Sequence, residues 1–214
     1  EMLVPLERVH VVPYGIDVRR FAPTASVLTR AALLRARYGP QPIVFSLGRH
    51  VPYKGFDVLI DAVARTDVQL VLGGTGPLTE MLKARAKASG AADRIHLVGA
   101  IAEADLPAWH HASDMYCLSS VEPAEAFGLV QAEAMACGRP VINTDLNNGV
   151  NYLNPDGVSG LTVPVGDADA MAAAIRKLAA DAALRKRLGE AGRERIATQF
   201  SISAMVGQTM DIYR

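Results

Sequence analysis

The sequence is short of cysteine, and this limits its chemistry. Its 214 residues include only two cysteines, Cys117 and Cys137, each inside an apolar run and far from any third metal ligand. A disulfide or a metal site is therefore not expected. We interpret both residues as buried thiols of a protein that works in the reducing cytoplasm.

The sequence also lacks net charge and long apolar runs. Lys plus Arg number 22 and Asp plus Glu number 22, so the formal net charge is zero. The broad positive surface that binds nucleic acid or an anionic membrane is thereby excluded, although a local basic pocket is not. No stretch approaches the roughly 20 uncharged apolar residues of a membrane-spanning helix. Peripheral membrane association of a longer enzyme remains compatible with this composition.

The first residues do not resemble a targeting segment. Residues 1–15, EMLVPLERVHVVPYG, lack the charged-then-apolar order of a signal peptide. A strand-like run, at 9–13, already begins within the first ten residues. We interpret the chain as part of a longer protein. With 50% apolar and 21% charged residues, residues 1–214 are expected to form one domain with a substantial core.

Short β-branched runs alternate with longer helical patterns along the chain. The pattern predicts strands at 9–13, 43–48, 68–74, 94–99, 114–120, 140–144 and 160–164. It predicts helices at 55–66, 77–89, 103–113, 127–137, 167–180 and 183–199, and a last helix within 200–214. Asp167 is placed to cap the fifth of these helices. The alternation predicts an α/β fold, a doubly wound, Rossmann-like parallel sheet flanked by helices.

In such folds ligands bind beyond the carboxyl ends of the strands. After the predicted strand at 43–48, residues 48–55 read GRHVPYKG, with Arg49 and Lys54 between glycines. Arg offers a planar fork for phosphate oxygens, Lys a mobile point charge, and the following helix its first N–H groups. This segment indicates an anion site, although a loop with two solvated cationic side chains would have the same sequence pattern.

A second segment carries two carboxylates eight residues apart. Glu125 follows a predicted strand, Phe127, Gly128 and Leu129 are expected to open the next helix, and Glu133 lies within it. At 1.5 Å per residue the carboxylates would be offset by about 12 Å along the axis. That offset suits hydroxyls at the two ends of a diphosphate-linked ligand, with the diphosphate at the helix N-terminus. Two solvated Glu residues are the alternative.

Two more loops follow predicted strands. Residues 72–77, LGGTGP, are rich in glycine, and Pro77 suits a first helical position, but the dinucleotide-binding fingerprint is incomplete. Residues 144–150, TDLNNGV, are rich in turn formers. Because the carboxyl ends of parallel strands share one edge, all four segments are expected on one rim.

Taken together, four motifs resemble a known family. GRHVPYKG, LVLGGTGPL, EAFGLVQAEAMACGRPVI and DGVSGLTVPVGD are similar to the C-terminal domain of the family 4 glycosyltransferases, over about residues 9–188. The resemblance implies one half of a GT-B fold, with the N-terminal acceptor domain absent from this chain. It implies a nucleotide-diphosphate sugar donor and retaining hexosyl or mannosyl transfer without metal or cofactor, in bacterial surface-polysaccharide or glycoconjugate assembly.

The resemblance also implies roles for individual residues. Arg49 and Lys54 match the pair that binds the donor diphosphate, and Gly48, which precedes Arg49, is counted among the donor-binding residues. Glu125 matches the residue that contacts the transferred sugar, and Glu133 the one that holds the ribose hydroxyls. The catalytic set implied is Arg49, Lys54 and Glu125.

Backbone groups complete the implied donor site. Phe127, Gly128 and Leu129 match the segment whose amides face sugar and phosphate, and Ile101 matches a position whose backbone faces the nucleobase. Residues 147–152, NNGVNY, depart from the family's usual two glycines followed by Pro-Glu. This version is similar to mannosyltransferases of surface-polysaccharide assembly and favours GDP-mannose. The family's role for that loop Glu is not transferred.

Two other functions are weighed beside this one. The chain could be a nucleotide-binding module without transfer activity, or a nicotinamide-dependent oxidoreductase domain, against which the incomplete glycine fingerprint argues. The domain alone is expected to bind nucleotide without transferring sugar, because acceptor and a further catalytic side chain come from the other half. His110 and His111 are expected to be packed or solvated and not functional, His50 to be a solvated loop residue, and the charged helix 183–199 to present a solvated face.

Overall fold

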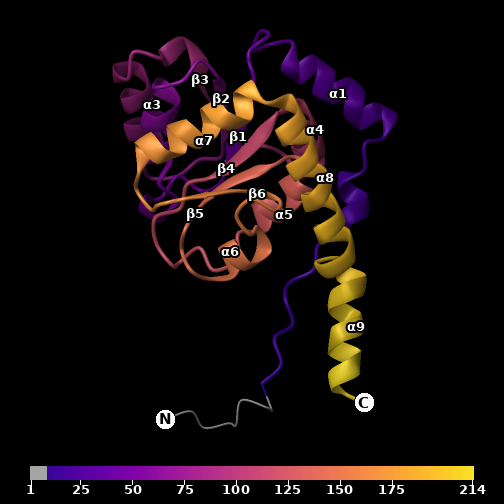
Figure 1. Cartoon of the computed structure of the whole chain (residues 1–214). Coiled ribbons are helices and arrows are strands. Elements are labelled where there is room, and N and C mark those ends of the chain that lie inside the picture. Colours follow the sequence, from indigo (N-terminus) through magenta and orange to yellow (C-terminus); the bar gives the residue numbers. More distant parts are fainter. Residues whose placement is uncertain (1–8) are drawn as a thin grey trace, which may run out of the picture.

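The computed structural model describes residues 9–214, and a six-stranded parallel sheet forms its centre (Figure 1). The strands are β1 Ile43–Leu47, β2 Gln69–Gly73, β3 Ile95–Gly99, β4 Met115–Leu118, β5 Val141–Thr144 and β6 Gly160–Val163. Their order across the sheet is β3-β2-β1-β4-β5-β6, and every ladder is parallel. The predicted doubly wound α/β fold is confirmed.

Helices cover both faces of this sheet (Figure 1). They are α1 Ala25–Arg35, α2 Phe56–Ala64, α3 Thr79–Ala88, α4 Leu106–Ala112, α5 Leu129–Ala136, α6 Gly149–Leu153, α7 Ala168–Ala180, α8 Ala182–Gln199 and α9 Ile202–Ile212. All seven predicted helices are confirmed, and Asp167 caps α7 by accepting from the Ala170 N–H at 2.8 Å. The sequence analysis missed α1, whose Thr24 side chain caps its first turn, and the short α6.

Two expectations about local structure were wrong. Residues 9–13 form no strand; the segment is extended, with Val11 79% exposed, and lies beside α9. Its β-branched residues favour an extended backbone, but a strand also needs a neighbouring strand to pair with, and the segment is followed only by the isolated Ile16–Ser201 bridge. Pro77 is not the first residue of a helix, because α3 begins two residues later at Thr79.

The strands alternate their side chains between two apolar layers. One layer joins β-sheet residues to α2, α3 and α7, and includes Val44, Leu72, Met115, Leu59 and Ile175. The other joins the opposite strand face to α5 and α6, and includes Phe45, Tyr116, Leu118, Met135 and Leu153. Cys117 and Cys137 are buried free thiols, as predicted, and burial raises the pKa of Cys137 to about 12.

The last two helices differ in how they are held. Most charged residues of α8 are exposed, as expected of a solvated face, while Leu188, Gly189 and Ile196 on its other side are buried against the body of the domain. α9 has no buried residue and projects from the domain beside the extended N-terminal segment (Figure 1). No helix among residues 9–214 is long and apolar enough to cross a membrane.

Backbone contact between α8 and the loop before β5 should be sensitive to one methyl group. A Cβ at Gly189 would lie 2.1 Å from the carbonyl oxygen of Gly138. We expect Gly189→Ala to destabilise the domain by about 1–3 kcal/mol, because the helix must shift away from the loop.

Gly207→Ala is the matched control, since a Cβ there meets nothing within 4 Å and Ala is the better helix former. Urea unfolding of both variants measures the difference. Equal stability of the two variants would contradict the close contact.

Candidate functional site

The strand order places a ligand-binding crevice between β1 and β4. The chain runs outward from β1 through β2 to β3, and then returns to the other side of β1 to form β4. At such a reversal the loops that follow the two central strands diverge and leave a crevice at the carboxyl edge. Residues 48–55 follow β1, and residues 119–128 follow β4. Two of the predicted segments therefore flank the crevice.

An ion pair between Lys54 and Glu125 joins these two loops. The Lys54 Nζ contacts Glu125 Oε2, and the two side chains are only 10% and 11% exposed. The Ser120 hydroxyl donates to the same carboxylate oxygen at 2.8 Å. Two predicted site residues, 71 positions apart in the chain, thus lie in direct contact.

Backbone geometry sets the position of Lys54. Gly55 has φ +59°, and a Cβ there would lie 2.2 Å from the Ser119 carbonyl oxygen, so only glycine fits without strain. The Ser119 hydroxyl donates to the Lys54 carbonyl at 2.8 Å, and the Val121 N–H donates to the Tyr53 carbonyl at 2.7 Å. The two loops consequently form one structural unit.

The glycine-rich loop 73–76 packs against the backbone of residues 48–50. A Cβ at Gly74 would lie 1.9 Å from the Gly48 carbonyl oxygen, and one at Gly76 would lie 2.6 Å from that of His50. The His50 N–H donates to the Thr75 carbonyl at 3.0 Å. Because these residues are glycines, their backbone can lie close to the loop that carries Arg49. Within residues 9–214 the exposed Arg49 side chain has no hydrogen bond or ion pair.

His50 is buried, so its prediction as a solvated residue was wrong. It is 0% exposed, its Nδ1 lies 2.9 Å from the Thr79 hydroxyl, and its ring packs edge-on against Phe56. Burial lowers the pKa of His50. The contact with Thr79 of α3 comes from a segment 29 residues away, an arrangement that local sequence does not reveal.

The helix that follows Glu125 begins later than expected. Gly128 precedes α5 with φ +70°, and the first helical residue is Leu129. Glu125 and Phe127 lie in the preceding loop, so the offset of about 12 Å derived from helical rise does not apply to Glu125 and Glu133. A loop, and not a continuous helix, connects Glu125 to the helix that carries Glu133.

Glu133 lies on α5 beside a buried histidine of α4. Its Oε2 is 3.7 Å from His110 Nε2, and neither atom has a hydrogen-bond partner in the described part of the chain. Glu133 retains 20% side-chain exposure, whereas His110 has none. His110 packs against Phe45 and Tyr116 with ring centroids 5.1 and 5.8 Å away, which confirms its predicted packing role. Burial lowers its pKa more than the nearby Glu133 raises it.

His111 also packs, since its Nε2 lies 3.0 Å from the Phe21 carbonyl oxygen.

The backbone positions implied by the resemblance lie at the same edge. Ile101 packs over Gly73 and Leu47, where a Cβ on Gly73 would meet its Cδ1 at 2.6 Å. Phe127 packs against Tyr14 and Phe200 with centroids 5.9 and 6.0 Å away.

Three amide side chains whose roles the sequence analysis missed connect the Glu125 loop and the loop around Val150. Asn148 donates to the Glu125 carbonyl at 2.9 Å. Gln131 donates to the carbonyls of Phe127 and Val150, both at 3.0 Å, and Asn143 donates to Val150 at 3.3 Å. Loop 147–152, which departs from the family pattern, is therefore part of the site's scaffold. In the sequence, the turn-forming residue Asn148 was the one indication that this loop belongs to the site.

Comparison with known proteins identifies the family of this chain. The family described as glycosyl transferases group 1 matches residues 35–195. The chain belongs to this family. The family resemblance and the GT-B type of fold are thereby confirmed, and the oxidoreductase alternative is set aside.

Two relatives and one solved structure illustrate the similarity. Alpha-D-kanosaminyltransferase of Streptomyces kanamyceticus is 35% identical over 99% of this chain and 55% of the relative. A GDP-mannose-dependent alpha-(1-6)-phosphatidylinositol monomannoside mannosyltransferase of Mycolicibacterium smegmatis is 34% identical over 85% and 50%. The structure of Anabaena HepE with UDP and glucose has a TM-score of 0.86 and 25% identity, over 95% and 56%. The chain spans about half the length of the relatives it matches.

The Lys54–Glu125 pair should contribute to the stability of this glycosyltransferase domain. Lys54→Met leaves a nearly buried carboxylate without its cation, and we expect a loss of about 1–3 kcal/mol. Glu125→Gln added to Lys54→Met should recover part of that loss, which a double-mutant cycle in urea measures.

The exposed Asp17–Arg19 pair is the control, and Asp17→Asn with Arg19→Met should show little coupling. Additive effects of Lys54→Met and Glu125→Gln would show that the buried pair is energetically unimportant.

The buried His110 should make the domain sensitive to acid. Its folded pKa lies below the ordinary value of about 6.5, so between the two values the unfolded chain binds a proton that the folded chain does not. The stability is complete above about pH 6.5 and falls as the pH is lowered further.

His110→Gln should reduce the slope of the unfolding free energy between about pH 6.5 and 5, whereas His10→Gln, at an exposed position, should leave it unchanged. An identical slope in wild type and His110→Gln would contradict this assignment.

Proposed function

We propose that this domain binds the nucleotide-diphosphate sugar of a retaining glycosyl transfer in the crevice between β1 and β4. The contact between Lys54 and Glu125 carries the proposal, because it places a cation and a carboxylate at the point where the two loops diverge. The exposed Arg49 adds a second cation on the same loop. A diphosphate needs cations, and a sugar hydroxyl needs an acceptor such as a carboxylate.

The proposed chemistry depends on charge that develops at the leaving group. As the glycosidic bond to the donor breaks, negative charge grows on the departing diphosphate. Arg49, Lys54 and the N-terminal amides of α5 would stabilise that charge in the transition state without a metal. Glu125 would release Lys54 to the phosphate and accept hydrogen bonds from the sugar hydroxyls. The ion pair keeps both groups in place before the donor arrives.

Glu133 is proposed to bind the ribose hydroxyls. One of its oxygens is buried 3.7 Å from His110 Nε2, and the side chain keeps 20% exposure, so part of Glu133 remains accessible to a ligand. The backbones of Phe127, Gly128 and Leu129 would face the sugar and phosphate, and the backbone of Ile101 the nucleobase. Ile101 packs over the carboxyl ends of β1 and β2, next to the crevice.

The proposal extends to a hexosyl or mannosyl donor in the assembly of a bacterial glycoconjugate. The name of the Mycolicibacterium relative includes GDP-mannose, and the HepE structure contains UDP and glucose. The resemblance of loop 147–152 to mannosyltransferases of surface-polysaccharide assembly favours GDP-mannose as the donor. We further propose that an N-terminal domain of the same enzyme supplies the acceptor site, so that this domain binds the donor without transferring sugar alone.

Calorimetric titration with GDP, UDP, GDP-mannose and UDP-glucose tests the donor site. We expect one nucleotide pair to bind saturably, and Arg49→Ala and Glu133→Ala each to weaken it about 10- to 100-fold through loss of a charge-assisted contact. Arg37→Ala, an exposed arginine outside the crevice, is the control and should bind as wild type.

Equal weakening by Arg37→Ala, or unchanged affinity in both site variants, would contradict the proposed position. Titration with NAD provides a further check, since no binding of a nicotinamide dinucleotide is expected.

A further inference from the structure

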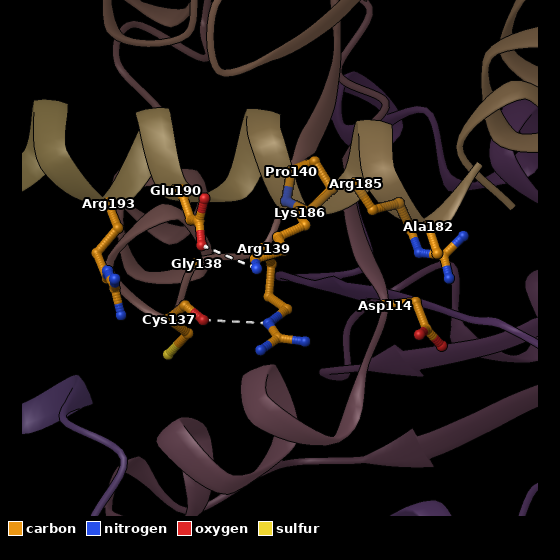
Figure 2. Close-up of a pocket in the computed structure, with 10 residues that line it drawn as sticks. All are labelled: Asp114, Cys137, Gly138, Arg139, Pro140, Ala182, Arg185, Lys186, Glu190 and Arg193. Carbon is orange, nitrogen blue, oxygen red and sulfur yellow. Dashed lines mark hydrogen bonds and ion pairs between the residues drawn. The ribbon is translucent and has the colours of Figure 1, made fainter.

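A second concave site lies at the opposite edge of the sheet, where β4 and β5 begin (Figure 2). It is a cavity of about 330 Å³ between the loop 137–140 and residues 182–193 of α8. Asp114 and Pro140, which immediately precede β4 and β5, form part of its wall. The cavity is therefore at the amino ends of the strands, away from the crevice between β1 and β4.

Positive charge predominates in this cavity. Arg139, Arg185 and Arg193 line it, and within residues 9–214 none of them has a carboxylate partner within 4.0 Å. Lys186 also lines it and lies 3.9 Å from Glu190. Figure 2 shows Arg185, Lys186 and Arg193 along α8, with Arg139 on the loop that faces them.

The remaining carboxylate of the wall does not neutralise this charge. Asp114 accepts from Arg35 at 2.7 Å and from the Ile43 N–H at 2.8 Å, so it is already paired outside the cluster. Four cations thus share the cavity with one weakly paired Glu190. An anion with more than one negative charge would complement the excess.

Two of the guanidinium groups are held in place by backbone carbonyls. Arg139 donates from Nε to Cys137 at 3.1 Å and from Nη1 to Ser113 at 3.0 Å. Arg185 donates from Nη1 to the carbonyls of Leu178 at 2.5 Å and Ala179 at 2.8 Å. Each group keeps further N–H donors for a ligand. Positioning before binding lowers the entropy that a ligand would otherwise cost.

The two walls of the cavity are also fixed against each other. Gly189 of α8 approaches the Gly138 carbonyl so closely that an added Cβ would lie 2.1 Å away. Arg139 follows Gly138 in the chain, and Lys186 and Arg193 are within one turn of Gly189 on α8. The spacing of the cations is consequently set by a backbone contact, which is unusual for solvated surface charges.

We propose that this cavity binds a phosphate group, as a phosphomonoester or a diphosphate, independently of the donor crevice. Arginine forks match the geometry of phosphate oxygens, and a phosphate dianion matches the excess of positive charge. The volume suits a small anionic group. The group would belong to a soluble metabolite or to the headgroup of a lipid, and the experiment separates these sources.

Amide NMR of the 214-residue chain, titrated with inorganic pyrophosphate, locates the site directly. We expect the Gly138 and Gly189 signals to shift, with an affinity separable from any shift of Gly48 and Gly55 in the donor crevice. The double variant Lys186→Gln/Arg193→Gln should weaken the shift at Gly138 and Gly189 by about tenfold or more. It leaves Arg139 and Arg185, which hold backbone carbonyls, unchanged.

The matched control is Lys177→Gln/Arg187→Gln, which removes the same charge from exposed positions that do not line the cavity. Flotation with phosphatidylcholine vesicles containing phosphatidic acid forms the second arm. Vesicle binding that the Lys186/Arg193 variant loses would support a lipid headgroup, and pyrophosphate binding without vesicle binding would support a soluble phosphate. Unshifted Gly138 and Gly189 signals without vesicle binding, or equal weakening by both double variants, would overturn the proposal.

Discussion

The buried contact between Lys54 and Glu125 connects the fold of this domain to its site. A lysine and a carboxylate that are only 10% and 11% exposed each need a polar or oppositely charged partner, because either one alone would be a desolvated charge. Their loops are joined by hydrogen bonds that the Ser119 hydroxyl and the Val121 N–H donate to backbone carbonyls, and the Asn148 amide holds the Glu125 backbone from the next loop. Three strand-to-helix connections therefore act together on one carboxylate.

The two edges of the sheet have different chemistry. At the carboxyl edge, closely packed glycines bring loops together around one ion pair and leave Arg49 exposed. At the amino edge, three arginines without carboxylate partners among residues 9–214 surround a cavity whose walls meet at Gly138 and Gly189. Parallel sheets present strand starts on one side and strand ends on the other, so one small domain has room for two anion sites that do not compete for space.

Burial by distant segments explains where sequence reasoning failed. His50 was expected in solvent, but it is fully buried and its Nδ1 lies 2.9 Å from the Thr79 hydroxyl. The inner face of α8 was not anticipated either, since Leu188 and Ile196 are buried there while most charged residues of this helix stay exposed. In both cases the contacting surface comes from a distant segment, whose position local composition does not encode. The run at 9–13 failed for the complementary reason: its residues favour an extended backbone, but a strand also requires a neighbouring strand to pair with.

The sequence by itself determined the α/β class, six strands, seven of the helices and the four loops on one edge, because hydrophobic period and glycine placement are local properties. It also identified Arg49, Lys54, Glu125 and Glu133 as candidate residues. Only the tertiary structure decided that β4 lies beside β1, that Lys54 pairs with Glu125, and that His110 lies behind Glu133. Those facts depend on packing between segments tens of residues apart, and burial there changes which partner each charged group takes.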